Sequence, residues 1–517
     1  MGRTPAQPDE GVLLSRSFDV LVIGAGSAGS VLARRLVDAG RRVAILEAGG
    51  PDTNPAIANV SRLGELWQGP EDWNFLTTPQ PGCAGRQLRL PRGKVLGGSH
   101  ALNATIWVRG AREDFDAWAY NGCPGWGWDD VVPVFEAIEN SDVAGPTRGT
   151  DGLLDVRVNF DRNPLQEDLI AGAEEIGIPE NPDYNSGVLD GVSRMQLNLR
   201  DDARFNTWHA YLRPVADNPL LEIITGAEVT RLLVENGTVT GVEFRRDGAL
   251  ETLTAAETVL CAGAIGSPAI LLRSGIGPAE ELRAVGIEPV LDAPGVGRNL
   301  HDHLLSPVIY TTTEKPVPAP GPAPAETHLF WRSRPDLAVP DTQPIHFSVP
   351  MYFLPEMSGP DNGFSLVAGI VRPLSRGSIT LTGPSVDDEL AIDLGALTEQ
   401  ADVDSLVASV RQCRRLGGSD ALAHWGPVEV YPGAEVDDSD EALERYVRET
   451  AVTYHHQVGT CRMGLDNEAV VDPRELRVYG IAGLRVADAS IMPSVPSGNT
   501  NAPSVMIGER AAEMMLR

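Results

Sequence analysis

The chain has few cysteines and no long hydrophobic run. Its five cysteines are scattered through 517 residues without a Cys-x-x-Cys or Cys/His spacing, so the pattern indicates neither a disulfide framework nor a metal site. No segment approaches the roughly 20 consecutive apolar residues that a membrane-spanning helix needs. Residues 1–16 lack the charged and apolar regions of a secretion signal. We therefore expect a flexible leader over residues 1–16, a cytoplasmic protein and no membrane partner.

Basic residues are also in the minority. Lys and Arg number 42 against 71 Asp and Glu, which gives a formal net charge of −29. Such a charge repels phosphate backbones and argues against nucleic-acid binding. Apolar residues make up 42% of the chain, enough for a large core, and the length suits two or three domains.

The first strong motif lies near the N-terminus. Residues 20–23 are a continuous apolar run, as in a buried parallel strand. Gly24, Gly26 and Gly29 then match the G-x-G-x-x-G fingerprint, in which the glycines allow a tight turn, close approach of a pyrophosphate and close helix packing. The spacing predicts a helix from about Ser27 to Ala39, with its N-terminus facing the phosphates.

A second strand, residues 42–46, is followed by Glu47. This acid comes about 18 residues after Gly29, close to the spacing of a carboxylate that binds ribose. An acid rather than an arginine at this strand end disfavours a 2′-phosphate. The segment therefore predicts a dinucleotide site, and on these residues FAD and NAD both remain open.

Two further glycine-containing segments have the same character. Residues 91–103 form a glycine-rich loop in which Gly97 and Gly98 would let the backbone lie against a ring or phosphate, unless the segment is a plain turn. Residues 258–262 read as a strand, followed by a helix with Pro268 near its first turn and a stop near Gly275.

The middle of the chain predicts a separate region. A proline-rich stretch, residues 315–325, should be an extended loop. Residues 345–349 and 378–381 alternate like antiparallel strands, and residues 401–417 resemble an amphipathic helix. His301 and His303 lack a third metal ligand at a recognisable spacing, so we expect hydrogen-bonded structural histidines.

The C-terminal part offers the acid–base chemistry. His456 precedes a Gly-Thr turn, and His455 beside it would face the opposite side of a strand. A helix is expected from about Ser504 to Leu516, with Pro503 in its first turn and Thr500 or Asn501 as its cap. Asn501 is either only a cap or lies at a helix N-terminus aimed at the cofactor, where the helix dipole would stabilise negative charge.

From about residue 17 to the C-terminus the chain resembles the glucose–methanol–choline (GMC) flavoprotein oxidoreductases. The segments that carry the resemblance are residues 24–29 with Glu47, 91–103, 263–277, 294–303 and 456–501. The resemblance implies FAD and an α/β fold, α+β overall, in which a Rossmann-like FAD-binding domain is interleaved with a substrate-binding domain built on an antiparallel sheet with helices. The expected bounds are residues 17–160, 220–310 and 450–517 for the first domain, and 161–219 and 311–449 for the second.

The resemblance also implies roles for particular residues. His456 would remove the hydroxyl proton while hydride passes to flavin N5, and Asn501 would hydrogen-bond the substrate oxygen, as in the choline-oxidase and hydroxymethylfurfural-oxidase branches. Members with covalent FAD carry a histidine at the position of Leu102, so we expect non-covalent FAD, although His100 keeps the alternative open. The residues expected to bind FAD are Gly24, Gly26, Ser27, Ala28, Gly29, Glu47, Ala48, Arg92, Val95, Gly97, Gly98, Ser99, Asn103, Ala104, Val229, Ala262, Gly263, Asp488, Ala489, Ala502 and Pro503.

The resulting hypothesis is FAD-dependent oxidation of a small primary alcohol, with aromatic or furan alcohols as candidates and dioxygen as acceptor. A dehydrogenase that uses a quinone or another carrier is the alternative, because Tyr454 stands where a small residue favours dioxygen in some oxidases. A non-redox lyase is a third possibility. The residues that could line the substrate pocket, or only pack in the core, are His455, Phe330, Tyr352 and Phe353. Glu326 and Glu356 could bind a cation, but we expect them to be solvated surface acids.

Overall fold

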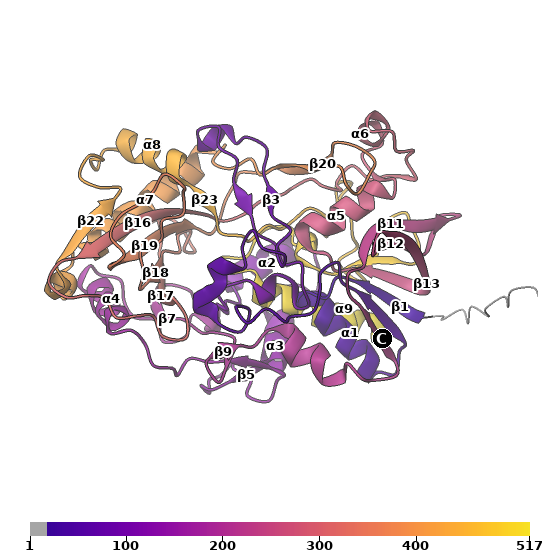
Figure 1. Cartoon of the computed structure of the whole chain (residues 1–517), viewed down its shortest axis with the longest axis horizontal. Helices are drawn as coiled ribbons and strands as arrows, with labels where there is room; N and C mark the ends of the chain where they lie inside the picture. Colours follow the sequence, from indigo (N-terminus) through magenta and orange to yellow (C-terminus); the bar gives the residue numbers. More distant parts are fainter. Residues whose placement is uncertain (1–17) are drawn as a thin grey trace, which may run out of the picture.

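The computed structural model describes residues 18–517, so the expected leader over residues 1–16 lies outside the described residues. The molecule has two lobes, each organised around one sheet (Figure 1). One lobe carries a mainly parallel sheet and the other an antiparallel sheet covered by helices. This arrangement confirms the expected α/β fold.

The first sheet contains the dinucleotide-type strands. The strands β10 (Leu221–Ile224), β2 (Val43–Leu46), β1 (Phe18–Ile23), β13 (Ala249–Leu260) and β24 (Leu484–Val486) pair in parallel. β13 continues into an antiparallel ribbon with β12 (Thr238–Arg246) and β11 (Glu228–Glu235). Because the β1 and β2 runs are almost entirely buried, they read in the sequence as continuous apolar segments.

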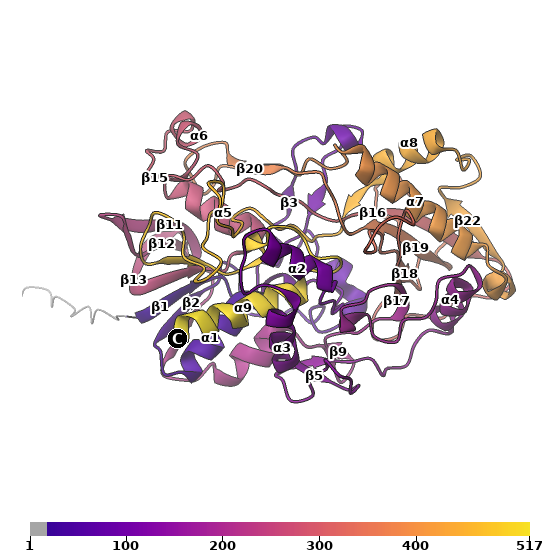
Figure 2. The same cartoon turned by 180° about the vertical axis from the view of Figure 1, so that it is seen from behind.

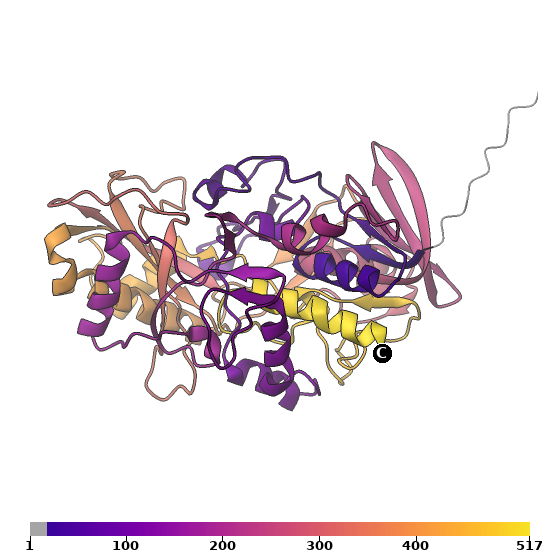
Figure 3. The same ribbon diagram turned by 90° about the horizontal axis from the view of Figure 1, so that it is seen from below.

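Two helices from opposite ends of the chain lie side by side against this sheet. They are α1 (Ser27–Asp38) and α9 (Asn501–Leu516), seen together in Figures 2 and 3. A Cβ at Gly508 would lie 2.6 Å from the Ala28 carbonyl oxygen, so only glycine permits this approach. Arg35 clamps Glu509 with two hydrogen bonds of 2.8 and 2.9 Å. The packing therefore joins the C-terminus to the first strand–helix unit.

Two helix boundaries differ from expectation. α9 begins at Asn501 rather than near Ser504. In α5 (Gly263–Arg273), Pro268 lies in the interior rather than in the first turn, because the helix starts only three residues after β13 ends. Proline cannot donate to the carbonyl four residues earlier, that of Ala264. The Thr460 hydroxyl donates to that carbonyl at 2.6 Å instead, which satisfies the freed acceptor.

The second sheet is antiparallel. Its order is β22 (Pro427–Tyr431), β16 (Leu304–Thr312), β19 (Gly363–Ile370), β18 (Ile345–Phe347), β17 (Ala325–Phe330) and β7 (Gly191–Arg194), and β23 (Val452–Thr453) pairs with β16. The helices of this lobe are α4 (Pro164–Glu175), α7 (Gln400–Gly417) and α8 (Asp440–Thr450). The strand predicted at 345–349 ends at Phe347, and the predicted strand 378–381 is β20 (Ser378–Leu381), paired with β21 (Leu390–Asp393).

The chain also contains shorter elements. They are α2 (Arg112–Tyr120), α3 (Trp128–Ile138), α6 (Ala279–Ala284), β3 (Phe75–Leu76), β4 (Arg89–Leu90), β5 (Glu139–Ser141), β6 (Leu154–Val156), β8 (Leu199–Arg200), β9 (Ala203–Arg204), β14 (Ile276–Gly277) and β15 (Leu291–Asp292). β16 starts at Leu304, inside the range expected for the first domain. We propose the discontinuous division of the chain into two domains, with its boundary immediately before this strand.

The topology gathers several chain segments at one place. The carboxyl ends of parallel strands lie at one edge of a sheet, and ligands of open α/β sheets bind there. Gly24, Glu47 and Ala262 follow β1, β2 and β13 at that edge, and Asp488 follows β24. In the second sheet, β16 begins directly after His303, and β23 ends just before His455 and His456. Both sheets therefore direct functional candidates toward the space between the lobes.

Replacing Gly29 with alanine tests the close packing at the start of α1. A Cβ there would lie 2.0 Å from the Gly24 carbonyl oxygen, so the backbone must shift. We expect Gly29→Ala to lower the free energy of unfolding by about 1–3 kcal/mol in urea titrations. Gly64→Ala is the matched control, because nothing lies within 4 Å of its added Cβ. Equal stability of the two variants would contradict this packing.

Candidate active site

Two glycine loops touch backbone to backbone at the N-terminus of α1. Gly24 has φ +103°, and a Cβ there would lie 2.6 Å from the Cys261 carbonyl oxygen. The Gly97 amide donates to the Ala25 carbonyl at 2.9 Å. Gly98 has φ +54°, and its Cβ would lie 2.7 Å from the Gly26 Cα. These glycines keep a backbone-lined cradle open where larger residues would fill it.

A buried carboxyl group lies beside this cradle. Glu47 accepts hydrogen bonds from the amides of Ala25 and Gly49, each at 2.9 Å. Burial raises the pKa of Glu47 to about 7. Each carboxylate oxygen has two acceptor sites, so Glu47 keeps capacity for further donors such as the hydroxyls of a ribose.

Asp488 has a different environment. Its carboxylate accepts hydrogen bonds from the Gly263 amide at 2.8 Å, from Ser267 Oγ at 2.6 Å, and from the amide and hydroxyl of Ser490 at 2.8 and 2.5 Å. These four protein donors occupy the carboxylate. Asp488 therefore holds the start of α5 against the turn at Ala489, and it orients the cradle rather than offering its own oxygens to a ligand.

The residues at this edge suit a dinucleotide cofactor. Neither α1 nor α9 has a side-chain cap or an acidic residue in its first turn. Their first amides and the positive ends of their dipoles are therefore available to negative groups. Together with the open glycine cradle and the spare acceptor capacity of Glu47, this donor and acceptor set fits the pyrophosphate and ribose of FAD.

A chain of hydrogen bonds surrounds the imidazole of His456, which is 8% exposed. His456 Nδ1 lies 3.0 Å from His303 Nδ1, and His456 Nε2 lies 3.2 Å from Asn499 Nδ2. The ring of Tyr454 stacks on His456 with 4.3 Å between centroids. The His456 amide donates to Asp302 at 2.7 Å, which fixes the backbone of this segment.

The structure corrects the identity of the asparagine beside His456. Asn499 holds that position, and its Oδ1 accepts a hydrogen bond from Gln343 Nε2 at 3.2 Å. Asn501, which the sequence analysis assigned to this role, instead accepts from Ser27 Oγ at 2.7 Å and lies 3.2 Å from His100 Nε2. Because α9 begins at Asn501, that side chain points to the start of α1 instead of to His456.

The hydrogen-bond directions determine the protonation of His456. The Asn499 Nδ2 group can only donate, so His456 Nε2 must accept. His456 Nδ1 then carries the proton and donates to His303 Nδ1. Because His303 Nδ1 accepts this hydrogen bond, the neutral His303 ring carries its own proton on Nε2. The tautomers are thus assigned from the network.

Electrostatics keep these imidazoles neutral. Burial, reinforced by the neighbouring His303, His455 and Arg92, lowers the pKa of His456 well below its ordinary value of 6.5. Burial lowers the pKa of His303 to about 3. At neutral pH, His456 therefore presents an unprotonated Nε2, which is the form that a general base requires.

His455 and Arg92 lie on the other side of this segment. His455 has φ +65°, its Nδ1 lies 2.6 Å from Thr453 Oγ1, and its ring meets Trp67 edge-on at 5.3 Å. Arg92 Nη2 donates to the His455 carbonyl at 2.6 Å. The two adjacent histidines thus have different partners, as expected, and only His456 joins the network with His303 and Asn499.

The aromatic candidates separate into two groups. Phe330 is fully buried beside Gly498, whose added Cβ would lie 3.5 Å from the Phe330 ring, and Phe353 packs against the same apolar cluster, which includes Tyr454. Tyr352 does not join them, because its hydroxyl donates to the Pro360 carbonyl at 2.9 Å and its ring meets Tyr431 of the edge strand β22. Tyr352 is therefore removed from the predicted pocket.

The other predicted cofactor residues lie around the two glycine loops or support them. Ser99 Oγ accepts from the Gly93 amide at 3.1 Å, and Asn103 Oδ1 accepts from Arg204 and from the Thr105 amide. Val229 is a core residue of β11. Residues that lie next to the loops or helix starts already described are Ala28, Gly29, Ala48, Val95, Ala104, Ala262, Ala489, Ala502 and Pro503.

Several residues of the network were not identified from the sequence. The sequence pattern does not indicate Gln343 or His328, because an isolated amide and an isolated histidine belong to no motif. His303 was expected only as a structural histidine, the role that His301 fills by accepting from the Val495 amide at 2.9 Å. Glu326, expected on the surface, is fully buried and accepts from the Asn163 amide at 2.7 Å.

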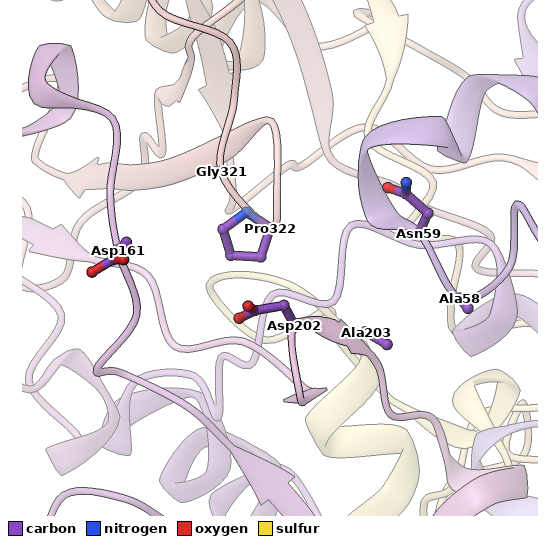
Figure 4. A pocket seen from close by; sticks show the side chains of 7 residues that line it. All are labelled: Ala58, Asn59, Asp161, Asp202, Ala203, Gly321 and Pro322. Atoms are coloured by element: carbon purple, nitrogen blue, oxygen red, sulfur yellow. The ribbon is translucent and has the colours of Figure 1, made fainter.

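A surface cavity lies apart from His456. It has a volume of about 490 Å³, and Figure 4 shows its lining residues, Ala58, Asn59, Asp161, Asp202, Ala203, Gly321 and Pro322. None of the predicted site residues lines it. It adjoins the segment that supports the second glycine loop, because Arg204, next to Ala203, donates to the His100 and Asn103 carbonyls.

The raised pKa of Glu47 predicts a pH effect on stability. The folded state binds this proton more tightly than the unfolded state, so the stabilisation is complete below about pH 4.5 and is lost as the pH rises through about 7. Between these two pH values, the free energy of unfolding of the FAD-free wild-type protein should fall by roughly 1–3 kcal/mol more than that of FAD-free Glu47→Gln. Urea titrations at several pH values measure this difference, and parallel profiles would contradict a raised pKa.

Comparison with known proteins agrees with this geometry. Residues 18–305 and residues 373–508 match the two sequence models of GMC oxidoreductases. The chain is 35% identical to an oxygen-dependent choline dehydrogenase of Rhizobium rhizogenes, over 96% of this chain and 95% of the relative. Between residues 18 and 517, no helix combines the length and apolar character needed to cross a membrane.

Solved structures show the same fold. A pyridoxine 4-oxidase from Mesorbium loti is 36% identical with a TM-score of 0.92, covering 96% of this chain and 99% of that one. An Aspergillus oryzae formate oxidase, studied for the modification of its FAD, is 25% identical with a TM-score of 0.90, covering 96% of this chain and 98% of that one. The chain therefore belongs to the GMC oxidoreductases, FAD-dependent enzymes that act on the CH–OH group of their donors.

Proposed function

We propose that this enzyme oxidises a small primary alcohol to the aldehyde, with His456 as general base and dioxygen as final acceptor. The observation that carries the proposal is the buried His456–Asn499 pair, in which the hydrogen-bond directions leave His456 Nε2 unprotonated. FAD, when bound, supplies the acceptor for the hydride and its electron pair.

The residues around His456 can perform the proton transfer. An alcohol hydroxyl is a very weak acid, and loss of hydride from its carbon becomes easier as the hydroxyl proton leaves. His456 Nε2 takes that proton, the C–H bond breaks with its electron pair, and the C–O bond becomes a carbonyl. The Asn499 amide has a second N–H, which can hydrogen-bond the substrate oxygen as negative charge develops on it.

Cofactor binding rests on the glycine cradle. Residues 24–29 and 97–98, together with the starts of α1 and α9, would hold the phosphates, and Glu47 would hold a ribose. Both ring nitrogens of His100 are engaged, because Nδ1 accepts from the Thr207 amide at 3.3 Å and Nε2 faces Asn501 at 3.2 Å. With Leu102 nearby, this favours non-covalent FAD.

Dioxygen as acceptor is supported by the names of two similar proteins, an oxygen-dependent dehydrogenase and an oxidase. The name pyridoxine 4-oxidase also favours an aromatic alcohol. The competing dehydrogenase hypothesis rests on Tyr454, whose large ring stacks on His456 where a small residue would leave room for dioxygen. Anaerobic mixing with alcohols followed by air distinguishes the two. Rapid reoxidation with peroxide formation supports an oxidase, whereas slow reoxidation supports a dehydrogenase.

His456→Ala tests the base directly. We expect the rate of anaerobic flavin reduction by a substrate alcohol to fall about 10²- to 10⁴-fold, because general base catalysis contributes that range. FAD content should stay the same. His424→Ala is the control, since this histidine is half exposed and pairs with Asp168, which is not one of the residues around His456. A His456 variant that reduces flavin at the wild-type rate would exclude the assigned role.

Comparison of the two asparagines tests the correction to the site. Asn499→Ala should lower the rate of flavin reduction about 10- to 100-fold, because it removes a hydrogen bond to a developing charge. Asn501→Ala should act on FAD retention and thermal stability instead, because its partners are Ser27 and His100. Stopped-flow reduction and FAD release on heating measure the two effects. The reverse pattern would restore Asn501 as the partner of the substrate.

A further inference from the structure

Two buried polar atoms beyond Asn499 lack partners. Gln343 Nε2 lies 3.2 Å from both Asn499 Oδ1 and His328 Nδ1. Across residues 18–517, Gln343 Oε1 and His328 Nε2 have no hydrogen-bond partner, although Gln343 and His328 are both 0% exposed. Buried polar atoms in folded proteins are nearly always paired, so two neighbouring unpaired atoms indicate that a ligand supplies their partners.

The hydrogen-bond directions define what these atoms offer. The Gln343 amide uses its two N–H groups toward Asn499 and His328, so its Oε1 remains as an acceptor. His328 Nδ1 accepts from Gln343, and burial lowers the pKa of His328 to about 3, so the neutral ring carries its proton on Nε2. The pair thus presents one acceptor and one donor, both uncharged.

The walls around this pair are aromatic and apolar. The His328 ring packs edge-on against Tyr184 at 4.5 Å and Phe330 at 4.9 Å. Gly498, adjacent to Asn499, faces Val108 and Phe330. The backbone N–H of Gln343 donates to the Gly369 carbonyl at 3.0 Å, which fixes the position of this residue. The nearest acid along β17, Glu326, accepts a hydrogen bond from the Asn163 amide, and burial raises the pKa of its carboxyl group, which favours the neutral form.

We infer that Gln343 and His328 form a second recognition subsite that selects alcohols bearing another uncharged group able to donate and accept hydrogen bonds, such as a phenolic hydroxyl or an amide. The inference rests on the proposed function for the position of the reacting hydroxyl at His456. It adds the substrate class. A trimethylammonium group offers neither a donor nor an acceptor to this pair, and an unsubstituted ring leaves both atoms unpaired.

The test compares three alcohols on the FAD-loaded enzyme: benzyl alcohol, 3-hydroxybenzyl alcohol and 4-(trimethylammoniomethyl)benzyl alcohol. Anaerobic stopped-flow reduction gives the rate constant divided by the dissociation constant for each. We expect 3-hydroxybenzyl alcohol to exceed benzyl alcohol roughly 10- to 100-fold, because an unpaired buried polar group penalises the unsubstituted ring. The cationic alcohol should be the poorest of the three. Equal values, or a preference for the cation, would overturn the inference.

Variants assign the preference to the two residues. His328→Phe keeps an aromatic ring against Tyr184 and Phe330 but removes the donor, and Gln343→Met removes the acceptor at similar volume. In each, the ratio between the hydroxylated and unsubstituted alcohols should fall below about threefold. Gln80→Met is the control, since Gln80 is equally buried but bonds to Thr78 and Asp393. An unchanged ratio in both test variants would place the preference elsewhere.

Binding of the aldehydes separates this inference from the proposed function. If no alcohol reduces the flavin, the proposed oxidation fails. Titration of the flavin spectrum with 3-hydroxybenzaldehyde and benzaldehyde still reports the subsite, because it needs no turnover. Tighter binding of the hydroxylated aldehyde that is lost in His328→Phe supports the subsite. Equal affinities overturn it regardless of catalysis.

Discussion

The hydrogen bond between the Nδ1 atoms of His303 and His456 is the interaction on which the site depends. It can form only if one ring donates and the other accepts, so it excludes a proton on both nitrogens. The Asn499 amide on the far side of His456 removes the remaining ambiguity. Burial keeps both rings neutral by lowering their pKa values. The site therefore holds an unprotonated nitrogen, His456 Nε2, in a buried position.

That arrangement requires the two sheets to meet. His303 leads into β16 of the antiparallel sheet, and His456 follows β23, which pairs with the same strand. Asn499 arrives from the segment before α9, which packs on α1 of the parallel sheet. The cradle for FAD lies at the carboxyl edge of that parallel sheet. The FAD cradle and the proposed base, His456, thus come from different lobes, and the interleaved chain order holds them together.

The sequence predicts local features well, but it predicts contacts between distant segments of the chain poorly. The glycine fingerprint, Glu47 and α1 follow from short-range rules of turn geometry and periodicity, and the structure has them within one or two residues. Asn499 and Asn501 differ by only two positions, and the start of α9 decides which one reaches His456. Gln343 and His328 lie on separate segments of the second sheet. Their contact depends on the pairing of β17 with β18 and on side-chain direction, neither of which has a local signal.

The pH dependence of anaerobic flavin reduction by the best alcohol tests the central claim most directly. If His456 is neutral through burial, the rate constant for reduction divided by the dissociation constant of the alcohol stays constant from about pH 6 to pH 9, since the pKa of His456 lies well below 6.5. A rate that falls tenfold per pH unit below an inflection at pH 7 or higher, and that loses this inflection in His456→Ala, would contradict the account. It would show a base that is charged at neutral pH before substrate binds.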